Sequence, residues 1–482
     1  MSDLPANLPD SAVIARFGAA LTAHIGMQFP EEKYDELGRV LHQRMEATGL
    51  DCAAYINQLD ALPGRAELAQ LARELTINET YFLRHTEQFD ALAEVALPDC
   101  ARAAALAGSR PLQILCAGCA SGEEAYSVAI VLRERCPQIE ANITAFDLNP
   151  AVLKKAERGV YGNWSLRACP EDTRARWFRR VGTDVELDAS IRAMVRFEER
   201  NLAEPAPLFW MEARFDVILC RNLLMYFSPE QAQAAVSRMA HALAPHGYLF
   251  LGHAETLRGI SSQFHLCHTH EAFYYQRKDR HESLAPMQAL HRETSAHGVQ
   301  QMPLPKLLAG DTGWFDAITA ASARVHALLP PAHAHVHGAT PEADVPDDTD
   351  TLLLKAVNAS HDGRLDDAEA LCRALLAADE MSAGAHYVLA LCREGRGQAA
   401  DAFEHDRIAA YLDPGFAMPR LHMGLSLRRA GQRAAARNEL EAAATLLQLE
   451  DPARVLLFGG GFQREALIAL CRAELDALEA RA

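Results

Sequence analysis

Hydrophobic positions three or four residues apart dominate the first part of the chain. Val13, Phe17 and Leu21 follow this spacing, and the same spacing recurs as far as Leu75. Because an α-helix has about 3.6 residues per turn, such positions fall on one face of a helix. We therefore predict an all-helical N-terminal domain over residues 11–106.

Short apolar runs that alternate with helical stretches replace this pattern after Pro111. Ser228, followed by Pro229 and by Gln231 three residues on, is typical of a helix start. Strands in alternation with helices form a mainly parallel sheet that is covered on both faces. We predict an α/β domain over residues 107–277, with strands at 112–116, 143–146, 195–197, 215–220 and 248–251 and helices at 123–135, 150–157 and 229–243.

The stretch 278–348 loses this periodicity and is rich in Pro, Ala, His and Asp. Such a composition predicts a flexible linker. A weak apolar patch over 314–329 allows a helix inside it. His333, His335 and His337 alternate there, but no acid or cysteine stands beside them at ligand spacing, so we favour the linker over a metal site.

The last part of the chain contains an internal repeat. Gly363, Gly397 and Gly431 are each 34 residues apart, and small residues recur at fixed distances from them. Small residues at fixed points of a 34-residue period let paired helices pack closely, as in tetratricopeptide repeats. We predict an all-α solenoid over 349–482, with repeats at 349–382, 383–416 and 417–450 and a capping helix over Gln463–Leu478. Such an array binds a protein or peptide that the sequence does not identify.

Composition and charge narrow the classes of function. The chain has 482 residues, of which 49% are hydrophobic, so it is long enough for several globular domains. Its 64 acidic and 47 basic residues give a formal charge of −17, which argues against nucleic acid as a partner. The 11 scattered cysteines are typical of reduced intracellular thiols. Without a signal peptide or an apolar run of about 18 residues, we expect a cytoplasmic protein with no membrane insertion.

The turn after the first predicted strand carries candidate chemistry. Gly118 and Gly122 flank a loop that leads from the strand into a helix, where backbone can approach a ligand closely. Asp147 ends the second strand, where an acid can accept the hydroxyls of a ribose. Together these residues predict a ligand of the adenosine type.

Two acids at the start of that helix select the ligand further. Glu123 and Glu124 are poor neighbours for a pyrophosphate but suit the sulfonium and ammonium of S-adenosylmethionine. The alternative is that both acids only complement the helix dipole. Cys116 and Cys119 form a C-x-x-C pair without a second pair at zinc spacing, so we predict no metal site.

A polar turn follows the fourth predicted strand. Arg221, Asn222 and Tyr226 come directly after the run 215–220. Ligands of open α/β sheets lie beyond the carboxyl ends of the strands, so these residues are candidates to face the same site. The alternative is an ordinary turn followed by core aromatic residues.

The sequence resembles the CheR family of bacterial chemotaxis receptor methyltransferases over residues 11–277. The most specific runs are LTINETYFLR, CAGCASGEEAYSVAI, FDVILCRNLLMYF and GYLFLGHAETL, in that order along the chain. The resemblance implies a Rossmann-like class I methyltransferase domain that uses S-adenosylmethionine. It also implies an enzyme that methylates glutamates of chemoreceptors, the methyl-accepting chemotaxis proteins, to γ-methyl esters and S-adenosylhomocysteine.

Carrying the family's motifs over implies a set of site residues. Arg84 is expected to hold the acceptor carboxylate and Tyr226 to orient it. Since a glutamate with a pKa of about 4.3 is ionised at pH 7, no general base is expected. The cofactor-binding residues implied by the motifs and by the glycine turn are Asn78, Thr80, Arg84, Gly118, Glu124, Asp147, Asn201, Leu202, Asn222 and Leu223.

Two segments depart from the family, and two other functions stay open. The helix Lys33–Glu46 corresponds to a strongly basic helix that faces receptors in the family, but in this chain acidic residues offset its basic ones. The segment Tyr161–Met194, where the family carries a small β-subdomain, leads into a predicted hairpin over Val185–Phe197.

The alternative functions are methylation of another protein or of a small molecule, and a non-catalytic scaffold whose repeats carry the function.

Overall fold

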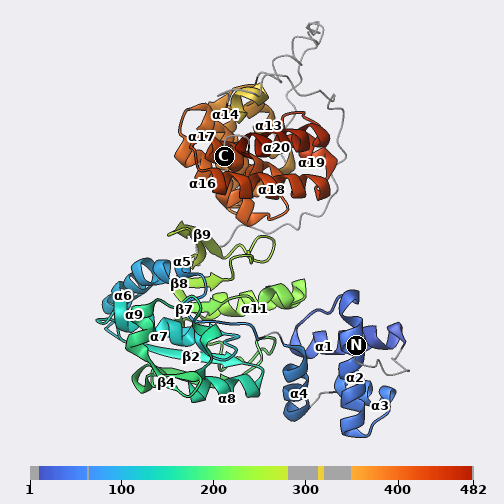
Figure 1. The fold of residues 1–482 in the computed structure, drawn as a ribbon, viewed down its shortest axis with the longest axis vertical. Coiled ribbons are helices and arrows are strands. Elements are labelled where there is room, and N and C mark those ends of the chain that lie inside the picture. Colours follow the sequence, from blue (N-terminus) through green and yellow to red (C-terminus); the bar gives the residue numbers. More distant parts are fainter. Residues whose placement is uncertain (1–9, 62–63, 77, 280–312, 320–348, 480–482) are drawn as a thin grey trace, which may run out of the picture. The chain divides into compact units, whose positions relative to one another are not determined.

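The computed structural model describes residues 10–61, 64–76, 78–279, 313–319 and 349–479, and it divides into two compact units, Met1–Leu284 and Ala285–Ala482 (Figure 1). Most of the predicted linker 278–348 lies outside the described residues, and so do His333, His335 and His337.

A seven-stranded sheet forms the centre of the first unit, in the order β6-β2-β1-β7-β8-β10-β9. Its first five strands are parallel and contain all five predicted strands. Ile114 and Leu115 alternate between the two faces of β1 and both are fully buried, so both faces are covered, as predicted. The strands are β1 Leu112–Ala117, β2 Ala141–Asp147, β6 Val195–Glu199, β7 Phe215–Cys220, β8 Leu243–Leu251, β9 Phe264–Thr269 and β10 Ala272–Arg277.

Helices connect these strands close to where the sequence predicts them. Ser228 accepts a hydrogen bond from the amide of Gln231 at 3.2 Å, which caps the helix that leads into β8. Asn149 caps the helix after β2 in the same way, by accepting from the amide of Ala151. The helices between the strands are α7 Glu123–Arg135, α8 Pro150–Arg158, α9 Glu171–Trp177, α10 Ala189–Arg192 and α11 Pro229–Ala242, with short turns η3 Asn163–Leu166 and η4 Leu224–Tyr226.

The antiparallel hairpin of β9 and β10 is absent from the sequence prediction. Its turn consists of His270 and Glu271, whose φ angles are 54° and 58°. Two-residue hairpin turns with positive φ normally carry Asn-Gly or Asp-Gly, so this turn lacks the usual signal.

The predicted hairpin over Val185–Phe197 is wrong. Asp188 caps the short helix α10 by accepting from the amide of Ser190 at 2.8 Å, and this helix separates the two segments. The first segment instead joins a small antiparallel sheet of order β3-β5-β4, and the second joins the main sheet as β6. The small sheet consists of β3 Val160–Tyr161, β4 Phe178–Val181 and β5 Asp184–Leu187.

The N-terminal segment is helical, as predicted. Phe17, Leu37 and Leu71 are fully buried, so the positions spaced by three or four do face inward. Its first helices, near the N label in Figure 1, are α1 Ser11–Ile25, η1 Glu31–Lys33, α2 Tyr34–Thr48, α3 Cys52–Asp60 and α4 Arg65–Leu75.

The later helices of this segment pack on the sheet. They are α5 Thr86–Ala91, a π-helical turn Leu92–Ala96 and α6 Leu97–Leu106. Cys100 and Ala104 of α6 belong to the same hydrophobic core as Ile114 of β1. The helices α5 and α6 therefore share the hydrophobic core of the sheet domain. The predicted domain boundary between residues 106 and 107 stays a prediction.

The described part of the second unit is helical throughout, and its helices follow the predicted period. The first helices of three pairs begin at 349, 383 and 417, and the second helices begin at 365, 399 and 433. The pairs are followed by a short helix and a longer one. The helices are α13 Thr349–His361, α14 Leu365–Ala378, α15 Ala383–Gly395, α16 Ala399–Leu412, α17 Ala417–Arg429, α18 Arg433–Leu449, α19 Pro452–Phe458 and α20 Arg464–Glu479.

The repeated glycines serve the turns of these pairs. Gly363, Gly397 and Gly431 have φ angles of 74°, 73° and 76° between the two helices of each pair. A Cβ at Gly397 or Gly431 would meet no atom within 4 Å, so the left-handed backbone requires glycine there, and close packing does not. Close packing does hold at Gly424, where a Cβ would lie 2.7 Å from Leu440.

Candidate active site

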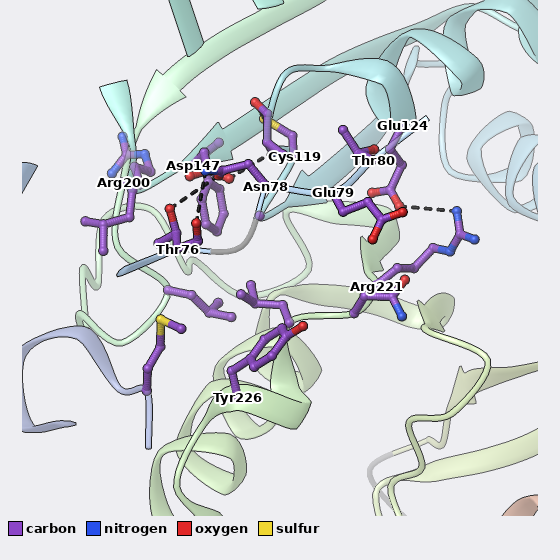
Figure 2. Close-up of a pocket in the computed structure, with 18 of the residues that line it drawn as sticks. Thr76, Asn78, Glu79, Thr80, Cys119, Glu124, Asp147, Arg200, Arg221 and Tyr226 are labelled. Atoms are coloured by element: carbon purple, nitrogen blue, oxygen red, sulfur yellow. Dashed lines mark hydrogen bonds and ion pairs between the residues drawn. The ribbon is translucent and has the colours of Figure 1, made fainter. Parts of the chain in front are cut away.

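A pocket with an empty volume of about 940 Å³, open mouth included, lies beyond the carboxyl ends of β1, β2, β6 and β7 (Figure 2). Pockets at this edge are typical of open α/β sheets. The ends of α1 and α4 also contribute to its wall. The predicted catalytic and cofactor-binding residues line it, namely Asn78, Thr80, Arg84, Gly118, Glu124, Asp147, Asn201, Leu202, Asn222, Leu223 and Tyr226. Two other candidates of the turn after β1, Gly122 and Glu123, do not line it.

Gly118 sits where β1 turns toward α7. Its φ is 72°, and its amide donates to the carbonyl of Phe146 at 2.9 Å. A Cβ at this position would lie 2.7 Å from Leu223 Cδ2, so both the backbone and the contact with Leu223 require glycine. This close approach brings the ends of β1 and β7 together at the pocket.

Asp147 is buried at the end of β2 and lines the pocket. Its Oδ2 accepts from the amide of Ala120 at 2.8 Å, and its Oδ1 accepts from the amide of Asn149 at 2.9 Å. Burial raises the pKa of Asp147, although these backbone amides oppose the shift. Each carboxylate oxygen has a second acceptor site, so the side chain can still accept hydroxyl groups of a ligand.

Glu124 and Glu123 have different environments, although they are neighbours at the start of α7. Glu124 lines the pocket and forms an ion pair of 3.3 Å with Arg221. Glu123 is 1% exposed and accepts from the hydroxyls of Ser121 and Ser165 at 2.7 and 3.0 Å. Successive residues of a helix are about 100° apart, so only Glu124 is available to a ligand.

Arg221 is a pocket residue that holds two other lining segments. Figure 2 shows its side chain directed at Glu124, on the opposite side of the pocket from Asp147, Thr76 and Arg200. Its Nη2 also donates to the backbone carbonyl of Arg84. Burial raises the pKa of Glu124 in spite of the adjacent guanidinium.

The loop after β7 depends on Glu255. The Oε2 of this buried carboxylate accepts from the amide of Asn222 at 2.7 Å, and its Oε1 accepts from the amide of Met225 at 3.1 Å. Asn222 has a φ of 58°, a left-handed conformation that asparagine tolerates well. Glu255 therefore positions the segment that carries Asn222 and Tyr226.

The segment after α4 brings Asn78 and Arg84 to the pocket. The Nδ2 of Asn78 donates to the carbonyl of Thr76 at 3.0 Å, and Asn149 reaches Thr76 Oγ1 at 3.3 Å. The Nη1 of Arg84 donates to the carbonyl of Glu79 at 3.1 Å. Its Nε is buried and has no hydrogen-bond partner among the residues that the structure describes.

The end of α1 closes another side of the pocket. Asn201 uses its Nδ2 to donate to the carbonyl of His24 at 2.6 Å, and Gln28 donates its amide to the carbonyl of Tyr226 at 2.7 Å. Through these contacts Met27 and Ile25 also line the pocket. The sequence analysis missed both, because Ile25 carries only the apolar spacing of a helix face and Met27 lies beyond the end of α1, where it pairs with the distant Phe227.

The two cysteines of the C-x-x-C pair are fully buried or nearly so, and Cys119 reaches the pocket wall. Burial raises the pKa of the Cys116 and Cys119 thiols well above the usual value. A thiol in such an environment is not activated as a nucleophile.

Known proteins match this chain over most of its length. The family profile described as "CheR methyltransferase, SAM binding domain" matches residues 78–273. A "Probable biofilm formation methyltransferase WspC" of Pseudomonas aeruginosa is 30% identical over 441 residues, covering 89% of this chain and 98% of that protein. "Chemotaxis protein methyltransferase 2" of Vibrio cholerae is 35% identical over 249 residues, covering 50% of this chain and 84% of that protein.

A solved structure is also similar, at lower identity. It is the magnesium protoporphyrin IX methyltransferase of Synechocystis with bound S-adenosylmethionine, 14% identical, with 57% of this chain and 100% of that chain covered and a TM-score of 0.24. Within the described parts of this chain, no helix is both long and apolar enough to cross a membrane.

Proposed function

Because this chain belongs to the CheR methyltransferase family, we propose that it methylates glutamate side chains of chemoreceptors, the methyl-accepting chemotaxis proteins. It is an S-adenosylmethionine-dependent methyltransferase of chemosensory signalling. The observation that carries the proposal is the pocket at the strand ends, in which Glu124, Asp147 and Arg84 come together from three separate segments.

The reaction transfers one methyl group and needs no proton transfer at the acceptor. A glutamate carboxylate oxygen forms a bond to the methyl carbon as the bond from that carbon to the sulfonium sulfur breaks. The electron pair of the broken bond stays on sulfur, which gives S-adenosylhomocysteine and a γ-methyl ester. Because the carboxylate is already ionised at pH 7, the protein has to align it and remove its water.

The pocket residues suit the methyl donor at two points. Asp147 supplies carboxylate oxygens at the end of β2 for the ribose hydroxyls. Glu124 supplies a buried negative charge for the ammonium group of the amino acid part. We further propose that Asn78, Thr80, Gly118, Asn201, Leu202, Asn222 and Leu223 complete the cofactor site.

Arg84 and Tyr226 are the proposed residues for the acceptor. Arg84 reaches the pocket with a guanidinium whose Nη1 donates to the backbone carbonyl of Glu79 and whose Nε has no hydrogen-bond partner within the part of the chain that the structure describes. It therefore has donors to offer a carboxylate. Tyr226 lines the same pocket on η4, which supports the proposal that it orients that carboxylate.

We also propose that the helical array is a set of tetratricopeptide repeats that binds a protein or peptide. The 34-residue spacing of the helix starts supports this proposal. Arrays of this kind carry binding surfaces and no chemistry, so the array recruits a partner to the methyltransferase.

Incubation with tritiated S-adenosylmethionine and a receptor cytoplasmic domain tests the function. We expect label on the receptor that is released as a volatile product by mild base, as a carboxyl methyl ester requires. The matched control is the same receptor with its candidate glutamates changed to alanine, which should stay unlabelled. Base-stable label, or label on a small molecule only, would support another acceptor, and no label with bound cofactor would support a scaffold.

A further inference from the structure

A short segment of the chain outside the helix pairs lies on the helical array of the second unit. Residues 314–319 are helical, and Trp314 and Ile318 are each 1% exposed. These two residues are four apart, so they share one face of the short helix. That face is therefore covered by the array.

The apolar contacts of this segment fit spaces that glycines leave open. A Cβ at Gly395, the last residue of α15, would lie 2.7 Å from the ring of Phe315. A Cβ at Gly460, in the turn between α19 and α20, would lie 2.8 Å from Ile318. The array thus has shaped room for an aromatic and an aliphatic side chain.

Polar contacts fix the register of the segment. Trp314 Nε1 donates to the hydroxyl of Tyr387 at 3.0 Å, and the amide of Phe315 donates to Glu394 Oε2 at 2.8 Å. Glu394 is itself held by His422 at 2.9 Å and by Arg429, both on α17. A buried, pre-positioned carboxylate that accepts the amide near the start of a short helix is a specific recognition element.

The helix pairs form their own core beneath this segment. Ala356, Ala390 and Leu440 are fully buried, and each of the three pairs packs through such small and apolar positions. The segment contacts the first helices of the second and third pairs and the turn after α19, which are far from it in sequence. Its position is that of a peptide bound to a repeat array, and not that of a further repeat.

We propose that this face of the array, centred on Tyr387, Glu394, Gly395 and Gly460, is a peptide-binding site, and that residues 313–319 occupy it as an intramolecular ligand. The partner is a protein segment with the same chemistry, two consecutive aromatic residues and an aliphatic residue four positions after the first, so that the first aromatic and the aliphatic residue share one helical face. This inference deepens the proposed recruiting role of the array and is independent of the methyl-transfer reaction.

A tethered ligand makes the site responsive to partner concentration. An intramolecular segment acts at an effective concentration of the order of millimolar, so an outside segment must compete with it. Partner binding then releases residues 313–319 from the array. A partner that binds weakly or is present at low concentration therefore does not displace residues 313–319, whereas a partner of high affinity does.

Fluorescence anisotropy with a labelled synthetic peptide of residues 310–322 tests the proposal on the full chain. In the variant Trp314→Ala/Phe315→Ala, whose own segment lacks both aromatic rings, we expect the peptide to bind at least about tenfold more tightly than to the unchanged chain. The same peptide with alanine at positions 314 and 315 should not bind either protein. An exposed change on α18, Glu441→Gln, is the matched control and should leave peptide affinity unchanged.

Further variants separate a bound ligand from a part of the core. Tyr387→Phe in the double-variant background should weaken the peptide about two- to tenfold, the effect of one lost hydrogen bond. Phe315→Ala alone, a milder change, should give an affinity between those of the unchanged chain and the double variant. The proposal is overturned if a folded double variant fails to bind the peptide. It is also overturned if both Trp314→Ala/Phe315→Ala and Phe315→Ala alone lose the helical signal of the second unit, because the segment would then be part of the core of the array.

Discussion

Glu124 Oε2 and Arg221 Nη1 lie 3.3 Å apart and are both buried, with 12% and 2% of their side chains exposed. They belong to α7 and to the loop after β7, and Arg221 also donates to the carbonyl of Arg84. One arginine thus connects three of the segments that line the pocket. Its charge is held in place by the same carboxylate that we propose for the ammonium of the methyl donor.

Replacing Arg221 by glutamine should lower the free energy of unfolding of the first unit by about 3–5 kcal/mol, because Glu124 is left buried without its cation. Chemical denaturation measures the change. Burial already raises the pKa of Glu124, and loss of the cation raises it further, so the folded state binds a proton more readily than the unfolded state. The stability of Arg221→Gln then falls as pH rises. Its loss of stability relative to the unchanged chain should therefore become smaller as pH is lowered from 8 to 5.

The double variant Arg221→Gln/Glu124→Gln should recover part of the lost stability. The control is Arg196→Gln, which removes an exposed arginine while its partner Glu198 keeps its pair with Arg200, and it should change stability by less than about 0.5 kcal/mol. A double variant no more stable than the single one would show that an unpaired Glu124 is not the cause.

Replacing Asp147 by alanine should weaken S-adenosylhomocysteine binding by about 1–3 kcal/mol, because ribose hydroxyls lose their acceptor. Calorimetric titration measures it. Asp147 also accepts two backbone amides, so Asp147→Asn, which keeps one acceptor oxygen, is the matched variant and should lose less. Unchanged affinity in folded protein would exclude Asp147 from the site.

The sequence predicts the local elements of this fold well because periodicity and caps are local. The cap of α11 by Ser228 and the five parallel strands follow from neighbouring residues. The predicted catalytic and cofactor-binding residues all line one pocket because the ends of parallel strands meet at one edge. Their individual roles stay predictions.

Long-range partners are beyond such patterns. The residues of the Glu124–Arg221 pair are 97 positions apart, and nothing in either local pattern names the other. The contact of Asn201 with the end of α1, across 177 positions, is equally hidden. The turn of His270 and Glu271 could not be predicted for a different reason. The pairing of β9 with β10 imposes positive φ angles on two residues that do not favour them.

Replacing Arg84 by alanine should slow methyl transfer much more than it weakens cofactor binding, because we assign its guanidinium to the acceptor carboxylate. Single-turnover rates and cofactor titrations on the same variant separate the two effects. Arg84→Lys keeps the charge and loses the paired donors, and it should recover only part of the rate. A defect confined to cofactor affinity would place Arg84 in the cofactor site alone.

A chain that ends at Lys278 should keep cofactor binding, since the pocket residues all precede this point and the first unit is compact. It should methylate a receptor fragment at saturating concentration and lose efficiency only when the fragment is scarce, because recruitment raises local concentration without changing the chemical step. The full chain at the same concentrations is the control. Inactivity at saturation would mean that the second unit is needed for catalysis itself.

The last prediction concerns a buried charge cluster in the helical array. His422 is fully buried, with its Nδ1 2.7 Å from Asp406 and its Nε2 2.9 Å from Glu394, which also binds Arg429. Burial alone would lower the pKa of His422, but the two carboxylates outweigh it and raise the pKa to about 10. The protonated imidazole thus stabilises the array fully below its unfolded pKa of about 6.5. This stabilisation is lost as pH rises through 10.

Replacing His422 by glutamine should therefore lower the stability of the second unit by about 3–5 kcal/mol at pH 7, because the buried Asp406 loses its cation and Glu394 keeps only Arg429. It should also flatten the decline in stability between pH 7 and pH 10, which calorimetric transitions of the full chain measure. His42→Gln, on α2 of the first unit, is the control and should leave the transition of the second unit unchanged. A decline that persists in His422→Gln would assign the titration to another group and contradict a charged His422.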